Sequence, residues 1–242
     1  MKIKALFDKF LKKYFFNPNW RCLACGKEIF ENQRFCSSCK DTLPYNDGPI
    51  CEHCGRAVIS FETYCSTCKN VLVDVDKCRS AFVYAPPINT LIKKAKYERG
   101  IYIIDYFAEQ LSLTYLQQYF NADYLTFIPM SEKAMKKRGY NQSKILAEKL
   151  SLLINVPVLD CIKKIKETER QATLGRAERL KNLDGAFRVF DKKSVKDKNI
   201  LIIDDVSTTG ATAQVVAKRL KDAGAKIVNL LTVASTPPID KY

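Results

Sequence analysis

Two adjacent carboxylates stand where an aliphatic run meets a run of hydroxyl residues. The stretch 200–212 reads ILIIDDVSTTGAT and places Asp204 and Asp205 between the two. A glycine-containing loop at a helix N-terminus presents backbone N–H groups to an anion, and serine and threonine hydroxyls add donors. Paired carboxylates would repel a bare phosphate, so the combination suits a phosphorylated sugar whose neighbouring hydroxyls donate to the acids. The plain alternative is a helix-capping turn with incidental acids.

Two common nucleotide-binding motifs are missing from the sequence. There is no G-x-x-x-x-G-K-[ST], which excludes a Walker A loop, and no G-x-G-x-x-G follows a strand. His53 is the one histidine, which excludes catalytic triads and metal sites built on several histidines.

Eight of the ten cysteines form four Cys-x-x-Cys pairs in a tandem repeat. CLACGKEIFENQRFCSSCK is followed by CEHCGRAVISFETYCSTCK, with each cysteine 29 residues from its counterpart. Two tight turns that aim four sulfurs at one ion make a closed, structural zinc site. The repeat favours two sequential Zn²⁺ sites over an interleaved arrangement; redox pairs, disulfides or an iron–sulfur cluster are the alternatives. The ligands are Cys22, Cys25, Cys36, Cys39, Cys51, Cys54, Cys65 and Cys68. Cys78 and Cys161 are expected to be buried small hydrophobes.

Net charge and hydropathy limit the kinds of partner and the cellular location that we expect for this protein. The net charge is +14, and most of the excess lies in residues 81–198, where it could attract phosphates of a small ligand or of nucleic acid. A solvated surface is the equal alternative. No apolar run approaches the roughly 18 residues of a membrane span, and lysines interrupt the N-terminal stretch. We therefore expect a cytoplasmic protein.

The chain predicts three parts. Residues 1–19 form an amphipathic helix, for which packing on protein is the usual case and peripheral membrane contact the alternative. The double zinc ribbon spans 20–72, and a larger domain spans 78–242. In that domain strands are expected at 79–87, 124–130, 185–190, 199–204 and 225–234. Helices are expected at 88–97, 102–120, 141–154 and 211–223, with a polar loop at 131–143 and a basic stretch at 162–182. Strands that alternate with helices, one of them the aliphatic strand NILIID, indicate an α/β fold with a parallel sheet. The acids lie at the carboxyl ends of the strands, the edge at which such sheets usually bind ligands.

The segment DDVSTTGAT resembles the phosphoribosyl diphosphate (PRPP) motif of type I phosphoribosyltransferases, with Ser207 where many members have an aliphatic residue. Nearly the whole chain resembles the ComF family, specifically ComFC-like competence proteins. The double ribbon, LIKKAKYERG, KKRGYNQSKILAEKL, RQATLGRAERLKNLDGAF and the acid pair occur in that order. The resemblance implies a type I phosphoribosyltransferase fold preceded by a small double zinc ribbon.

The resemblance also implies roles for individual residues. The acids would contact the ribose hydroxyls of PRPP, directly or through Mg²⁺-bound water, and the loop after them would hold the 5′-phosphate. Ser131 and Lys133 lie where this fold binds pyrophosphate, and Arg138 would assist. Residues 163–176, with Lys166, Arg170 and Arg176, occupy the place of the mobile loop that closes over the reacting centre. An ordinary basic surface is the alternative for these lysines and arginines. The implied catalytic residues are Asp204, Asp205, Lys133 and Arg138. The implied PRPP-binding residues are Ser131, Asp204, Asp205, Val206, Ser207, Thr208, Thr209, Gly210, Ala211 and Thr212.

The function implied by the resemblance is transfer of phosphoribose from Mg²⁺-bound PRPP to an unidentified acceptor, in DNA uptake during natural transformation. The alternative is a non-catalytic competence factor whose ribbons and basic loops bind single-stranded DNA or DNA-uptake proteins. A regulator that reads PRPP as a signal is a third hypothesis.

Overall fold

The computed structural model describes residues 21–29, 33–56, 58, 63–69, 74–97, 100–168 and 182–237. The chain divides into two compact units, Met1–Leu43 and Pro44–Tyr242. The helix expected at 1–19, with its membrane alternative, lies outside the described residues, as do Arg170 and Arg176. Within the described ranges, no helix combines the length and apolar character that a membrane crossing requires. The domain limits expected from the sequence stay predictions.

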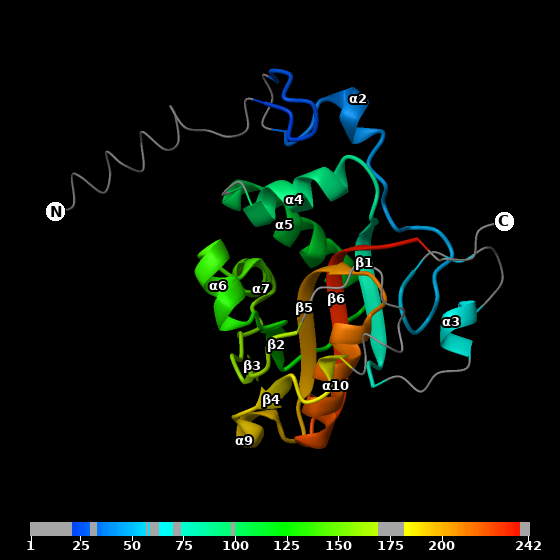
Figure 1. The fold of residues 1–242 in the computed structure, drawn as a ribbon. Helices are drawn as coiled ribbons and strands as arrows, with labels where there is room; N and C mark the ends of the chain where they lie inside the picture. The colour runs from blue at the N-terminus through cyan, green and yellow to red at the C-terminus, as the bar shows by residue number, and fades with distance from the viewer. Residues whose placement is uncertain are drawn as a thin grey trace. The chain divides into compact units, whose positions relative to one another are not determined.

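The larger unit is built on a four-stranded parallel sheet in the order β1-β6-β5-β2 (Figure 1). These strands are β1 (Lys77–Val83), β2 (Tyr124–Phe127), β5 (Asn199–Ser207) and β6 (Ile227–Ser235). In the register, Thr126 lies beside Ile202, Ile202 beside Leu230, and Ser80 beside Thr232. The two central strands, β5 and β6, are almost wholly buried, which explains their continuous aliphatic sequences.

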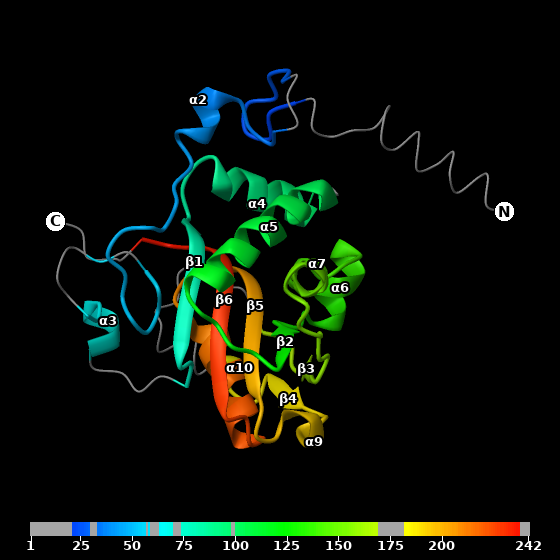
Figure 2. The same ribbon diagram turned by 180° about the vertical axis from the view of Figure 1, so that it is seen from behind.

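Helices cover both faces of this sheet. On one face, α5 (Ile101–Gln117) packs on β1 and β6, and α7 (Gln142–Ile154) packs on β2 and β5 (Figure 2). Next to α5 lies α4 (Ile88–Tyr97). On the opposite face, α10 (Ala211–Asp222) packs on β5 and β6 (Figure 1). The predicted α/β fold with a parallel sheet is therefore confirmed.

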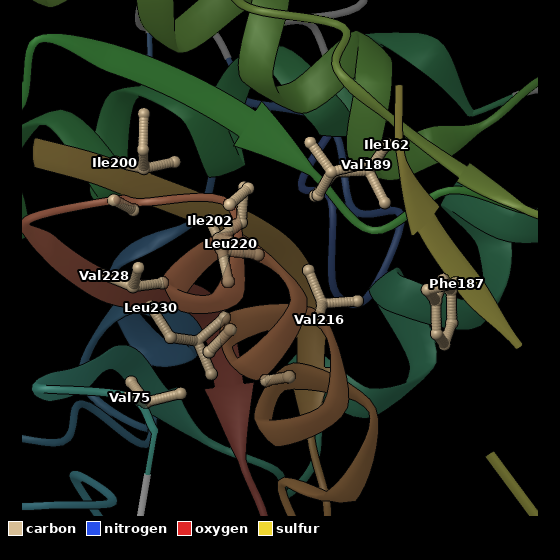
Figure 3. Close-up of a cluster of buried hydrophobic side chains, with 14 of the residues drawn as sticks. Val75, Ile162, Phe187, Val189, Ile200, Ile202, Val216, Leu220, Val228 and Leu230 are labelled. Atoms are coloured by element: carbon tan, nitrogen blue, oxygen red, sulfur yellow. The ribbon is translucent and has the colours of Figure 1, made fainter. Parts of the chain in front are cut away.

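The core beneath α10 follows the alternation of strand residues. Ile200 and Ile202 point toward Val216 and Leu220 of α10, so Leu201 and Ile203 between them face the other side of the sheet. A two-stranded antiparallel sheet, β3 (Ile162–Lys164) and β4 (Phe187–Val189), contributes side chains to this core. Figure 3 shows these side chains together: Val75, Ile162, Phe187, Val189, Ile200, Ile202, Val216, Leu220, Val228 and Leu230.

The two lone cysteines behave as the sequence predicts. Cys78 is 4% exposed and Cys161 is fully buried. Burial raises the pKa of the Cys78 thiol to about 12 and that of Cys161 to about 11. Both therefore act as small apolar side chains.

The expectation of a polar loop at 131–143 is wrong in part, because α6 (Glu132–Arg138) lies within it. The Oγ of Ser131 caps this helix by accepting from the Ala134 N–H, and Gly139 ends it at φ 83°. The cap and stop residues were present in the sequence, but a lysine-rich stretch without apolar periodicity hid them.

Other elements differ more modestly. The basic stretch 162–182 contains β3, and β5 runs to Ser207 because Val206 and Ser207 pair with Ala234 and Ser235. Three further one-turn helices were not expected: α2 (Ser37–Lys40), α3 (Ser66–Lys69) and α9 (Lys192–Val195).

Candidate functional site

The eight paired cysteines form two clusters of four sulfurs. One holds Cys22, Cys25, Cys36 and Cys39; the other holds Cys51, Cys54, Cys65 and Cys68, and within each cluster all sulfurs lie within 4.8 Å of one another. The Cys25–Cys36 and Cys54–Cys65 sulfur distances are 3.9 Å and 3.7 Å. A tetrahedral ion with Zn–S bonds of about 2.3 Å places its sulfurs about 3.8 Å apart. The eight residues therefore fit two zinc-binding sites. Each site takes its four cysteines from one repeat, which confirms the predicted sequential arrangement.

The backbone repeats as the sequence does. Cys22 N–H donates to the Lys27 carbonyl at 2.8 Å, and, 29 positions on, Cys51 N–H donates to the Arg56 carbonyl at 2.9 Å. Gly26 and Gly55 both take the left-handed conformation, at φ 75° and 65°. This turn directs the first two sulfurs of each repeat toward one point, and it explains why a glycine follows the second cysteine of the repeat.

The acid pair lies near the end of β5 and is held by the start of α7. Asp204 accepts a 2.7 Å hydrogen bond from Ser143 Oγ, and Asp205 accepts one of 2.7 Å from Gln142 Nε2. Asp205 also pairs with Lys96 Nζ of α4 at 2.7 Å, with their side chains 12% and 20% exposed. Two helices therefore deliver polar partners to the carboxyl edge of the sheet.

Burial and the neighbouring carboxylate set the charge of this pair. Desolvation, followed by repulsion from Asp205, raises the pKa of Asp204 to about 7, although Ser143 and Lys96 both oppose the shift. Near neutral pH, Asp204 is thus poised between an acceptor and a donor of hydrogen bonds.

The start of α7 is fixed by Asn141. Its Oδ1 accepts from the N–H groups of Ser143 and Lys144, while its Nδ2 donates to the Ile128 carbonyl at 3.0 Å, directly after β2. The roles of Gln142 and Ser143 were not foreseen from the sequence, although an asparagine ahead of an apolar-periodic helix is a recognisable N-cap signal. Lys96 lies within the segment LIKKAKYERG, but no local pattern pairs it with Asp205, which is 109 residues away in the chain.

The hydroxyl loop (Ser207–Thr212) joins β5 to α10. Val206 still lies within β5, Ser207 ends that strand, and Ala211 opens α10. Gly210 takes the N-cap position at φ 71° and contributes no side-chain cap. The first N–H groups of α10 are therefore not capped by the residue before them, as an anion-binding helix start requires.

The loop is anchored on its other side. The Thr208 carbonyl accepts from Thr236 Oγ1 at 3.1 Å, and the Ser207 carbonyl accepts from the Thr236 N–H at 3.0 Å. Thr209 Oγ1 accepts from the Ala211 N–H at 3.4 Å. Thr208 is exposed and Thr212 is half-buried.

The predicted pyrophosphate residues lie on and around α6. Ser131 is buried as its cap, and Lys133 is exposed, with its N–H donating to Glu167 Oε1 at 3.4 Å. This bond places the start of the predicted closing stretch beside α6, with Lys166 exposed next to it.

Arg138 faces the acid pair through an intermediary. Its guanidinium donates to Gln142 Oε1 and lies over the Tyr97 ring, 5.1 Å from the centroid. Gln142 in turn donates to Asp205, so the described structure gives Arg138 an orienting position behind the acid pair.

Comparisons with known proteins match both parts of the chain. A double zinc ribbon domain matches residues 12–69, and a phosphoribosyl transferase domain matches residues 134–240. Competence protein F of Haemophilus influenzae is 27% identical over 89% of this chain and 97% of its own length. DNA utilization protein YhgH of Escherichia coli O157:H7 is 30% identical over 63% of this chain and 69% of its own. Competence protein ComFC of Bacillus subtilis is 30% identical over 60% of this chain and 58% of its own.

Proposed function

Since the chain belongs to the ComF family, which joins a double zinc ribbon to a phosphoribosyltransferase domain, we propose that it binds PRPP and transfers phosphoribose to an acceptor. The observation that carries the proposal is the acid pair, held by Gln142, Ser143 and Lys96 at the sheet edge beside the hydroxyl loop. The names of its relatives support a role in DNA uptake. The ten implied PRPP-binding residues and the unidentified acceptor belong to this proposal. We also propose a cytoplasmic location, because the reducing cytosol keeps zinc-binding thiolates from forming disulfides.

The chain's own groups have clear tasks in this reaction. The hydroxyl loop and the start of α10 donate to the 5′-phosphate, while Asp204 and Asp205 accept from the two ribose hydroxyls. Gln142 and Ser143 fix the carboxylates, so that the sugar is positioned before the bond from its anomeric carbon to pyrophosphate breaks and the bond to the acceptor forms. Mg²⁺, when bound with PRPP, would neutralise part of the pyrophosphate charge. Lys133 supplies further positive charge to the leaving group, and Arg138 orients Gln142.

Pyrophosphate release from PRPP tests transfer directly. We expect release by the zinc-replete protein in the presence of an acceptor, screened among nucleobases and single-stranded DNA, and at least about 100-fold less from Asp205→Asn. Asp160→Asn, which alters an exposed aspartate paired with Lys144, is the matched control. Equal release from wild type and Asp205→Asn would contradict the proposal.

A second function is supported by the surface of α6. This helix exposes Lys133, Lys136 and Lys137, in a chain of net charge +14. Phosphate contacts by such side chains give binding that weakens steeply with salt. If the protein handles single-stranded DNA, replacing the three lysines with glutamine lowers affinity and flattens the salt slope by about two to three. An affinity for single-stranded DNA that does not change with salt concentration would exclude this function.

A further inference from the structure

The second zinc ribbon belongs to the larger unit, and its first turn is closely packed within that unit. Position 27 of the first repeat is an exposed lysine, whereas its counterpart, Arg56, is 4% exposed. A Cβ on Gly26 would meet nothing within 4 Å, while a Cβ on Gly55 would lie 2.3 Å from the Cys78 carbonyl oxygen. The second ribbon is therefore packed against the larger unit's own β1.

Several bonds join this ribbon to the strand. Cys78 N–H donates to the His53 carbonyl at 3.0 Å. Arg79, itself 4% exposed, donates to the Glu52 carbonyl at 3.0 Å and to its carboxylate at 2.9 Å. The zinc-binding turn 51–56 is thus held at fixed backbone points along β1.

Arg56 extends this attachment to the hydroxyl loop. Its Nη2 donates to the Thr208 carbonyl, 152 residues further along the chain. Its Nε is buried and has no hydrogen-bond partner among the described residues. A guanidinium is always charged, so a buried positive group lies directly behind the loop.

The zinc cluster borders the same place. A pocket open to solvent is lined by Cys54 and Cys68 from the ribbon and by Ser207, Thr209 and Gly210 from the loop. Four thiolates around one Zn²⁺ leave the cluster with a net negative charge. Arg56 follows the ligand Cys54 by two residues and bonds to the loop through the Thr208 carbonyl, so it connects the zinc-binding turn to the loop.

We propose that Arg56 is a positioning residue of the sugar-phosphate site, and that the second zinc ribbon is a structural part of that site. This inference rests on the proposed function. By holding the Thr208 carbonyl, Arg56 keeps the loop's N–H groups directed away from the ribbon, toward an incoming phosphate. Its charge adds to the attraction for that phosphate. Because Zn²⁺ shapes the turn that carries Arg56, occupancy of the second cluster controls the affinity for PRPP.

Calorimetric titration with PRPP and Mg²⁺ tests the role of Arg56. We expect Arg56→Met to weaken binding about 10- to 100-fold, the usual effect of losing a hydrogen bond from a charged group. Lys27→Met, at the equivalent position of the first repeat, changes affinity less than about twofold. Arg56→Lys keeps the charge and recovers part of the affinity, and it replaces Arg56→Met should that variant fail to fold. Equal affinity of wild type and a folded Arg56→Met overturns the inference.

A matched pair of cysteine variants tests the role of zinc. Cys54→Ser and Cys25→Ser remove equivalent ligands from the second and first clusters. We expect only Cys54→Ser to reduce PRPP affinity, with zinc content measured for both. A similar loss in both, or a loss in Cys25→Ser alone, overturns the inference.

Amide hydrogen exchange separates this inference from the proposed function. We expect Arg56→Met to speed exchange in residues 208–212 about tenfold or more, without speeding it in β2 or α7. Unchanged exchange in this loop overturns the positioning role. If wild type binds no PRPP, the proposed function fails, and faster exchange in the variant would still assign Arg56 to the loop.

Discussion

Asp204 and Asp205 are adjacent in sequence but differ in their partners. Asp205 has a cation and an amide donor at 2.7 Å, whereas Asp204 accepts a hydrogen bond of 2.7 Å from the Ser143 hydroxyl. Burial, and then the charge of Asp205, raise the pKa of Asp204, and Ser143 and Lys96 offset only part of this shift. The pair is therefore matched to a ligand that brings hydroxyls or positive charge.

Asp204 gives the protein a specific dependence of stability on pH. Its native pKa is about 7 against an ordinary value of 3.8, so the native state binds one proton more than the unfolded state between those values. The free energy of unfolding therefore falls as pH rises through this window. We expect Asp204→Asn to be more stabilising at pH 8 than at pH 4.5 in denaturant unfolding. The exposed Asp47→Asn is the control, and a pH-independent effect of Asp204→Asn would contradict the assignment.

Lys96 is expected to stabilise the unliganded acid pair. Removing one partner of a largely buried, charge-assisted bond costs about 1.5–3 kcal/mol. We therefore expect Lys96→Met to lower the free energy of unfolding by about that amount at pH 8, and by less at pH 5, where the acid pair retains a proton. Lys93→Met alters an exposed lysine on the same helix and serves as the control. Equal losses for the two variants would rule out this role.

At the scale of elements, α7 is the part that assembles the site. Its cap residue Asn141 bonds forward to the helix and back to the Ile128 carbonyl, while the next two residues reach the acids. The helix thereby ties the end of β2 to the end of β5. One short polar segment, residues 141–143, therefore bonds to both acids and to the residue that follows β2.

Asn141→Ala is the corresponding test. Loss of an N-cap costs about 1 kcal/mol. Removal of the Asn141 side chain, which is 4% exposed, also leaves the Ile128 carbonyl unpaired, so we expect the free energy of unfolding to fall by about 2–3 kcal/mol in total. Asn141→Asp keeps the cap but not the donor and should lose less. Asn121→Ala, at an exposed loop position, is the control in denaturant unfolding. A loss no greater than that of the control would show that α7 does not depend on this cap.

The sequence predicts some elements well and others poorly, for physical reasons. The strand NILIID, its position beside the acids and the helix after Gly210 follow from local pattern, and all are found. Helix α6 was missed because its cap and stop residues flank an almost wholly polar sequence. The contacts of Lys96 and Arg56 span 109 and 152 residues, so only the folded topology reveals them.

At the scale of the whole molecule, the tandem repeat serves two different settings. The first cluster belongs to Met1–Leu43 and the second to Pro44–Tyr242. Because metal binding and folding are coupled in small ribbons, each cluster adds stability to its own unit. Similar sequences have thus acquired unequal structural roles.

Zinc content and chelation test this division. We expect two Zn²⁺ ions per chain. When a chelator removes them, the unfolding temperature of the larger unit should fall only as the ion of the second cluster is lost. Cys25→Ser should reduce the content to about one ion and leave this transition in place, whereas Cys54→Ser should lower its midpoint. Identical thermal profiles for the two variants would contradict the division.

Calorimetric titration of the zinc-replete protein with PRPP and Mg²⁺, beside the double variant Asp204→Asn/Asp205→Asn, tests the sugar-phosphate site most directly. We expect saturable binding with wild type, and loss of that binding in a variant that keeps its zinc and its fold. The amides would retain the shape of the acid pair but not its charge, so the loss would assign the ligand to the carboxylates. No binding by wild type, or equal binding by both proteins, would contradict a PRPP site at the end of β5.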